Sequence, residues 1–138
     1  MKNYLLIAVA TVTLTSCFWQ DDDNEECQVN LCEFYTKPDS IDFQVKVNLN
    51  DDNPYVVYEV YDGLYDEFNT ANHILTDTAF SNTTYVYLPV GRHTFKAIYN
   101  RNGDEVWVFD SAKSKNKHYN CTPECWSTEN GSVNVKLQ

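Results

Sequence analysis

The chain has 138 residues, of which 20 are acidic and 10 basic, and its formal net charge is −10. Such a charge repels nucleic acid and anionic lipid head groups, so we exclude nucleic-acid binding. Ten tyrosines, seven phenylalanines and three tryptophans favour strands over helices. Beyond the N-terminal run, no stretch shows apolar residues at helical spacing over three turns.

An apolar run opens the chain. Lys2 precedes an apolar stretch over residues 4–14 that is too short to span a bilayer, and Leu14-Thr15-Ser16-Cys17 closes it. This closing segment resembles the lipobox of bacterial lipoproteins, where the chain is cut before the cysteine and the cysteine is lipidated. The resemblance implies a signal peptide over residues 1–16, lipidation of Cys17 and a membrane anchor of acyl chains. The alternatives are an ordinary signal peptide with a chance cysteine, or a buried helix.

An acidic segment follows the predicted lipidation site. Residues 18–26 (FWQDDDNEE) carry five carboxylates that repel one another, which predicts a solvated tether over residues 17–26. Such a cluster also resembles the surface-export signal of some Gram-negative lipoproteins, and a plain spacer is the alternative. We therefore expect a cell-envelope protein that is lipid-anchored in the outer membrane, and exposed on the cell surface if the second resemblance holds.

Four further cysteines lie near the two ends of the predicted domain, which spans residues 27–138. An even number in an exported protein predicts two disulfides among Cys27, Cys32, Cys121 and Cys125, with three possible connectivities. We favour cross-links between the two pairs over local bridges, because each would close a loop of roughly 90 residues. A Cys₄ zinc site is the alternative, although the spacing departs from the usual ligand spacing. We expect no metal and no cofactor.

Alternating apolar and polar residues predict about seven short strands, most of them joined by turns. They cover residues 41–49, 55–61, 73–78, 83–88, 93–100, 104–110 and 132–137. No crossover helix intervenes, so the predicted fold class is all-β: a disulfide-braced, two-sheet antiparallel Ig-like β-sandwich. The segment Leu88–Ala97 (LPVGRHTFKA) resembles a corner of many secreted Ig-like and prealbumin-like modules, with His93 where a tyrosine is common. This resemblance supports the architecture and implies no function.

A hairpin around Asn102-Gly103 has two possible registers, and the loop length decides between them. A two-residue loop would place Trp107 on one face with Lys96 and Ile98, as an exposed platform. A three-residue loop with a glycine bulge would set Trp107 opposite the small Ala97. We favour the three-residue loop, because large side chains then lie opposite small ones and fill the core better. In that register Trp107 is buried and no platform exists.

Motifs of known catalytic sites are missing from the sequence, so we predict that the protein is not an enzyme. Aromatic side chains beside carboxylates and amides can stack on sugar rings or on a protein partner. The candidates are Tyr55, Tyr61, Tyr65 and Trp126. The alternative is that these rings are half-buried in strands. A basic patch is predicted to be a solvated loop, and it comprises Lys113, Lys115, Lys117 and His118.

Three short segments resemble the acceptor motif of one bacterial O-glycosylation system. They are Asp39-Ser40-Ile41, Asp77-Thr78-Ala79 and Asp110-Ser111-Ala112, and they imply modification at Ser40, Thr78 and Ser111. Asp and Ser are common at turns, which is the alternative explanation. We expect a lipid-anchored, non-enzymatic binding or accessory module for a glycan or an envelope protein. The alternative is a structural subunit of a larger envelope assembly, and the sequence predicts no oligomeric state.

Overall fold

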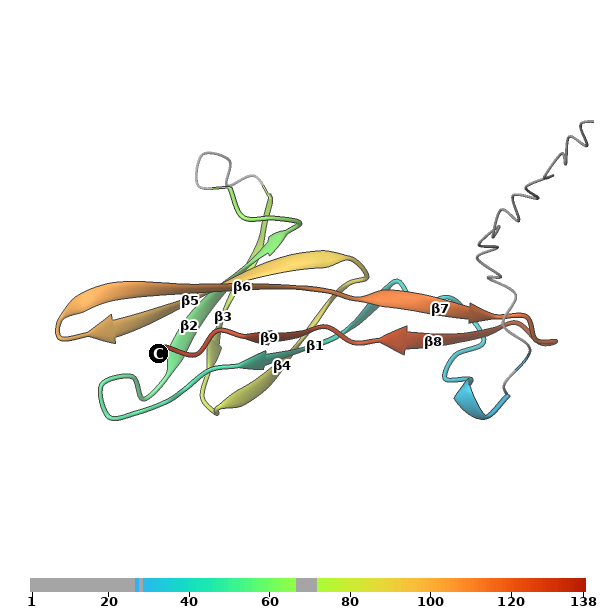
Figure 1. Ribbon diagram of the computed structural model, residues 1–138, viewed down its shortest axis with the longest axis horizontal. Helices are drawn as coiled ribbons and strands as arrows, with labels where there is room; N and C mark the ends of the chain where they lie inside the picture. The colour runs from blue at the N-terminus through green and yellow to red at the C-terminus, as the bar shows by residue number, and fades with distance from the viewer. Residues whose placement is uncertain (1–26, 28, 67–71) are drawn as a thin grey trace, which may run out of the picture.

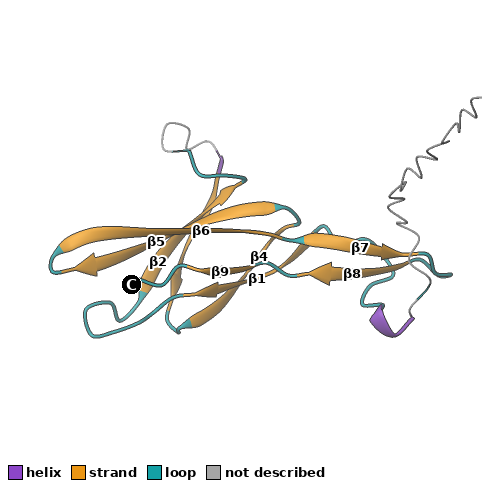
Figure 2. Cartoon of the chain, viewed as in Figure 1, coloured by secondary structure: helices purple, strands orange, loops and turns teal. Residues whose placement is uncertain are grey.

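The computed structural model describes residues 27, 29–66 and 72–138, which fold mainly into strands (Figures 1 and 2). The elements are a 3-10 turn, η1 (Val29–Leu31), and strands β1 (Ser40–Lys46), β2 (Val56–Asp62), β3 (His73–Ala79), β4 (Thr83–Pro89), β5 (Arg92–Arg101), β6 (Asp104–Lys113), β7 (Lys115–Tyr119), β8 (Cys125–Glu129) and β9 (Ser132–Asn134). Among these residues, no helix is long and apolar enough to cross a membrane. The predicted signal peptide, Cys17 and the tether lie outside the described residues.

Two sheets make the sandwich, one with strand order β4-β1-β9 and the other with order β3-β2-β5-β6. Neighbouring strands are antiparallel, except that β1 and β9 run parallel. Strands β7 and β8 pair as a separate antiparallel ribbon that extends beyond one end of the sandwich (Figure 1). The predicted all-β sandwich is therefore confirmed.

The core lies between the two sheets because side chains alternate in direction along each strand. Phe43 of β1, Tyr58 of β2 and Phe95 of β5 are fully buried there. The Tyr99 hydroxyl donates a hydrogen bond of 2.8 Å to the Val135 carbonyl, which ties the C-terminal segment to the larger sheet. Burial raises the pKa of Tyr99, so its phenol stays protonated as this bond requires.

Two disulfides hold the N-terminal segment against the β7–β8 ribbon. Cys27 is bonded to Cys121 and Cys32 to Cys125, at sequence separations of 94 and 93. The favoured long-range pairing is confirmed, and the zinc alternative is excluded because all four sulfurs are paired. Backbone hydrogen bonds in both directions between Phe34 and Trp126 reinforce the same junction.

The basic patch does not form the expected loop, because most of it lies on the unpredicted strand β7. Lys115 faces Glu129 across the ribbon, and their side chains are 3.1 Å apart. His118 lies 3.3 Å from the Glu124 carboxylate. Opposite charges across a strand pair stabilise a ribbon that has few apolar residues to reveal it in the sequence.

Candidate functional site

The β5–β6 hairpin closes through a two-residue turn. Asn102 and Gly103 have φ angles of 57° and 93°, as a type I′ turn requires. Trp107 therefore pairs with Ile98, while Ala97 pairs with Val108. The favoured three-residue loop was wrong, because asparagine tolerates the left-handed conformation and no third residue is needed.

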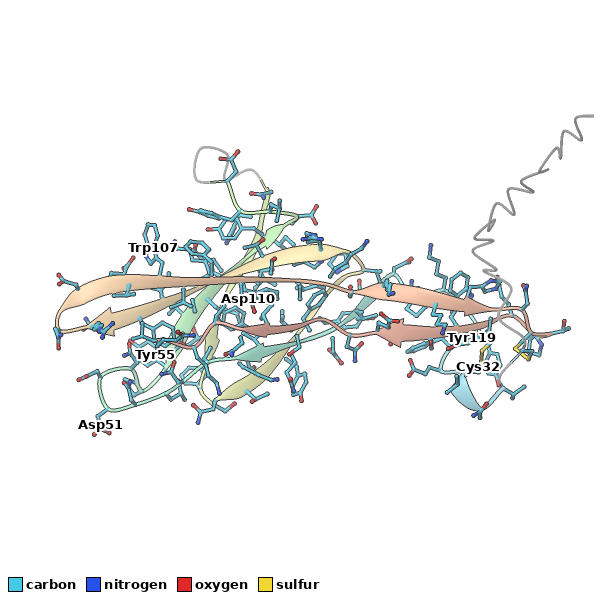
Figure 3. All side chains as sticks on the ribbon, in the orientation of Figure 1. Cys32, Asp51, Tyr55, Trp107, Asp110 and Tyr119 are labelled. Carbon is cyan, nitrogen blue, oxygen red and sulfur yellow. A yellow bond between two sulfur atoms is a disulfide. The ribbon has the colours of Figure 1, made fainter. Side chains whose placement is uncertain are left out.

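Trp107 consequently lies on the outer face of the larger sheet instead of in the core. It is 50% exposed and projects away from the smaller sheet (Figure 3). Its indole N–H donates to the Glu105 carboxylate, and Lys96 Nζ lies 3.9 Å from the centre of its ring. These two contacts fix the orientation of the indole while leaving half of its surface to solvent.

A largely buried ion pair between Lys96 and Glu59 lies next to the Trp107 ring. Lys96 Nζ lies 3.0 Å from Glu59 Oε2, and the Tyr61 hydroxyl donates to the same oxygen at 2.5 Å. Burial opposes ionisation of Glu59, but the hydrogen bonds from Tyr61 and Lys96 and the lysine charge outweigh it and lower the pKa of Glu59. Burial, followed by the bond to Glu59, raises the pKa of Tyr61. The ion pair with Glu59 therefore holds the Lys96 ammonium group against the Trp107 ring.

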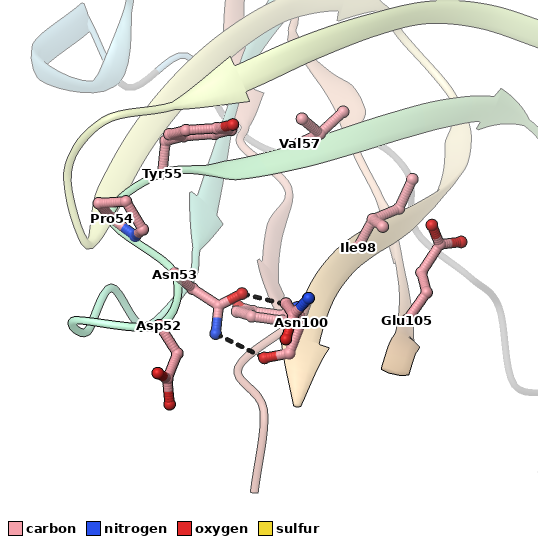
Figure 4. Close-up of a pocket in the computed structure, with 9 residues that line it drawn as sticks. Asp52, Asn53, Pro54, Tyr55, Val57, Ile98, Asn100 and Glu105 are labelled. Atoms are coloured by element: carbon pink, nitrogen blue, oxygen red, sulfur yellow. Dashed lines mark hydrogen bonds between the residues drawn. The ribbon is translucent and has the colours of Figure 1, made fainter. Parts of the chain in front are cut away.

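An open groove of about 380 Å³ lies on the same outer face, between the start of β2 and the hairpin (Figure 4). Its floor contains Val57 and Ile98, which are cross-strand partners, and Tyr55 stands beside them. The Asn53 amide closes one end by accepting from the Asn100 N–H at 2.7 Å and donating to the Asn100 carbonyl at 2.9 Å. The lining residues are Asp52, Asn53, Pro54, Tyr55, Val57, Ile98, Tyr99, Asn100 and Glu105.

Aromatic side chains flank this groove on both sides. Tyr55 is 54% exposed, and its ring centre lies 6.3 Å from that of Phe80. Trp107 borders the opposite side. It is hydrogen-bonded to Glu105 and is the cross-strand partner of Ile98, and both of these residues line the groove. Two strand spacings, about 10 Å, separate β2 from β6. We call the set formed by Tyr55, Val57, Ile98, Glu105 and Trp107 the aromatic groove.

The other predicted ligand-binding aromatics lie elsewhere. Tyr61 is only 4% exposed, and Tyr65 packs between it and Phe109 at ring distances of 4.9 and 4.8 Å. Trp126 lies on β8, with its ring 4.4 Å from that of His118. Tyr55 alone of the four predicted residues lines the groove. Sequence reasoning missed Trp107 because it assigned the longer turn, although the Asn-Gly pair was the signal that could have found it.

The three predicted glycosylation sites lie on different strands. Ser111 is exposed on β6, whereas Ser40 on β1 and Thr78 on β3 are half-buried. Ser40 also lines a second hollow of about 470 Å³ between the N-terminal segment and β1. Within the described part of the chain, no group of three His, Cys, Asp or Glu residues could hold a metal ion. Modification at these three sites remains a prediction.

No protein-family model, no curated protein and no solved structure matches this chain.

Proposed function

We propose that the protein is a lipid-anchored, non-enzymatic binding module of the cell envelope whose aromatic groove binds a neutral glycan. The observation that carries the proposal is Trp107. A large apolar ring is held half exposed beside an open groove, by a hydrogen bond at its edge and a lysine against its ring. Fixing such a ring in advance removes part of the entropy cost of binding.

The chemistry of the groove favours a flat ligand rich in hydroxyl groups. The electron-rich faces of Tyr55 and Trp107 attract the weakly positive C–H groups of a sugar ring. Asp52, Glu105 and Asn100 supply acceptors and donors for hydroxyl groups at the polar end. Because two of these are carboxylates in a chain of net charge −10, acidic glycans are repelled, and the proposal commits to neutral ones.

The proposed anchor is acylated Cys17 in the outer membrane, as the lipobox resemblance implies. Cys32 and Tyr55 lie at opposite ends of the domain (Figure 3). An anchor attached through the N-terminal segment would therefore hold the aromatic groove away from the membrane, where a glycan can reach it.

A glycan array followed by titration calorimetry tests the proposal. We expect neutral oligosaccharides to bind and Trp107→Ala to weaken them at least tenfold, which is about 1.4 kcal/mol. Tyr85→Ala is the matched control, because Tyr85 is 61% exposed on the smaller sheet and its loss should leave affinity unchanged.

Two results would contradict the glycan proposal. One is an equal loss of affinity in Trp107→Ala and Tyr85→Ala. The other is the absence of any glycan signal while a pull-down from detergent-solubilised membranes retains a protein. The second result would favour the alternative of a subunit in a larger envelope assembly.

A further inference from the structure

We infer that the end of the domain opposite the aromatic groove is a lipid-docking surface that rests on the membrane beneath the protein. We call this surface the docking pole. It comprises Val29, Leu31, Phe34, Tyr35, Lys37 and Lys117. The inference rests on the proposed acylation of Cys17 and goes beyond it, because an acyl anchor alone leaves the orientation of the domain free.

Four apolar side chains are exposed at this pole. Val29 is 73% exposed and Tyr35 68%, while Leu31 and Phe34 are each 42% exposed. All four lie within seven consecutive residues, around a 3-10 turn that has no buried residue of its own. Clustered exposed apolar side chains of this kind mark a surface that another apolar phase covers.

Several contacts hold the pole against the β7–β8 ribbon. Val29 and Tyr35 line a small hollow of about 100 Å³ together with Pro123 and disulfide-bonded cysteines. The Glu33 carboxylate accepts from the backbone N–H and the hydroxyl of Thr128, both at 3.0 Å. Side-chain contacts therefore join the N-terminal segment to the ribbon in addition to the two disulfides.

Two lysines, Lys37 and Lys117, lie near the apolar cluster, although the chain as a whole is strongly acidic. Lys37 Nζ lies 5.7 Å from the Trp126 ring centre, and Lys117 Nζ lies 5.3 Å from that of Tyr119. Long lysine stems can lie along an apolar surface while their ammonium groups meet lipid phosphates, as interfacial protein surfaces require.

The length of the tether identifies a membrane as the occupant. Nine residues lie between Cys17 and Cys27, and Cys27 is bonded to Cys121 beside the ribbon by its disulfide. The ten Cα–Cα steps from Cys17 to Cys27 span at most about 36 Å when the chain is fully extended. An acylated Cys17 thus keeps the docking pole within this distance of the bilayer at all times, which gives lipid a high effective concentration there.

Hydroxyl-radical footprinting of the acylated full-length protein tests the inference on vesicles of phosphatidylethanolamine and phosphatidylglycerol. Tyr35 reports on the docking pole, and Tyr55, at the far end, is the internal control. We expect the ratio of Tyr35 to Tyr55 oxidation to be about threefold lower for the unaltered protein than for Val29→Asp/Leu31→Asp. Leu64→Asp, at an exposed position just after the end of β2, should leave the ratio as it is in the unaltered protein.

The possible failures are distinguishable. If mass spectrometry finds no acyl chain on Cys17 and the protein does not float with vesicles, the proposed anchor fails, and the docking inference fails with it. If the protein is acylated and floats, but the double variant leaves the ratio unchanged, only the docking inference is overturned. Protection of Tyr35 that rises with protein density at constant lipid would assign the pole to a second copy and would also overturn it.

Discussion

Among the four glycines, Gly131 has the least room for a side chain. It is buried, and a Cβ there would overlap with the fully buried ring of Phe43. We expect Gly131→Ala to lower the free energy of unfolding by about 2 kcal/mol, as overpacked cores do, measured by urea denaturation. Phe43→Leu removes the overlapping ring, so the two substitutions combined should cost less than the sum of their separate losses. Strictly additive losses would show that the two sites do not meet.

Between elements, the Lys96–Glu59 pair joins β5 to β2 across the outer face. Lys96→Met leaves the Glu59 carboxylate without its charged partner. We expect the free energy of unfolding to fall by about 2 kcal/mol. This is less than for a fully buried pair, because the Glu59 side chain is 23% exposed. Glu59→Gln in the Lys96→Met background should recover part of the loss in a double-mutant cycle. No recovery would mean that Lys96 contributes through packing alone.

The same pair predicts a dependence of stability on pH. The pKa of Glu59 is lower in the fold than its ordinary value of 4.5, so its ionised form stabilises the fold above that pH. The contribution is lost as the pH falls through the folded value. We expect the difference in unfolding free energy between the unaltered protein and Glu59→Gln to be constant near neutrality and to shrink below pH 4.5. A difference that grows with acidification would contradict this assignment.

Strand alternation also explains which elements the sequence could reveal. Ile41, Phe43 and Val45 alternate with polar residues because one face of β1 is buried, so this strand was predictable. Strands β7 and β8 were not predicted, because charge pairs and disulfides hold them. Neither kind of contact requires alternating apolar residues in the sequence. The aromatic groove could be predicted only through Tyr55, since the rest of it depends on the conformation of two turn residues.

For the whole molecule, the two disulfides interlock, because Cys32 and Cys121 each lie inside the loop closed by the other pair. The first bridge closes a loop of more than 90 residues and contributes about 5 kcal/mol in the chain-entropy model. Once the first bridge has formed, the second closes a loop of only about ten residues, which runs through residues 27–32 and 121–125. It contributes about 3 kcal/mol. We expect removal of either bridge by paired Cys→Ser substitution to cost about 3 kcal/mol, and removal of both about 8 kcal/mol. If calorimetry showed that the loss for both bridges equals the sum of the two single losses, the interlocked arrangement would be contradicted.

The turn at Asn102 and Gly103 has a consequence for how this protein could be altered. Because side chains on a strand alternate with a period of two, one extra residue between these positions would exchange the two faces of β6. Trp107 would turn inward and Val108 outward in a single step. A one-residue insertion would therefore break up the aromatic groove and the core together, whereas a two-residue insertion would lengthen the hairpin tip and preserve both.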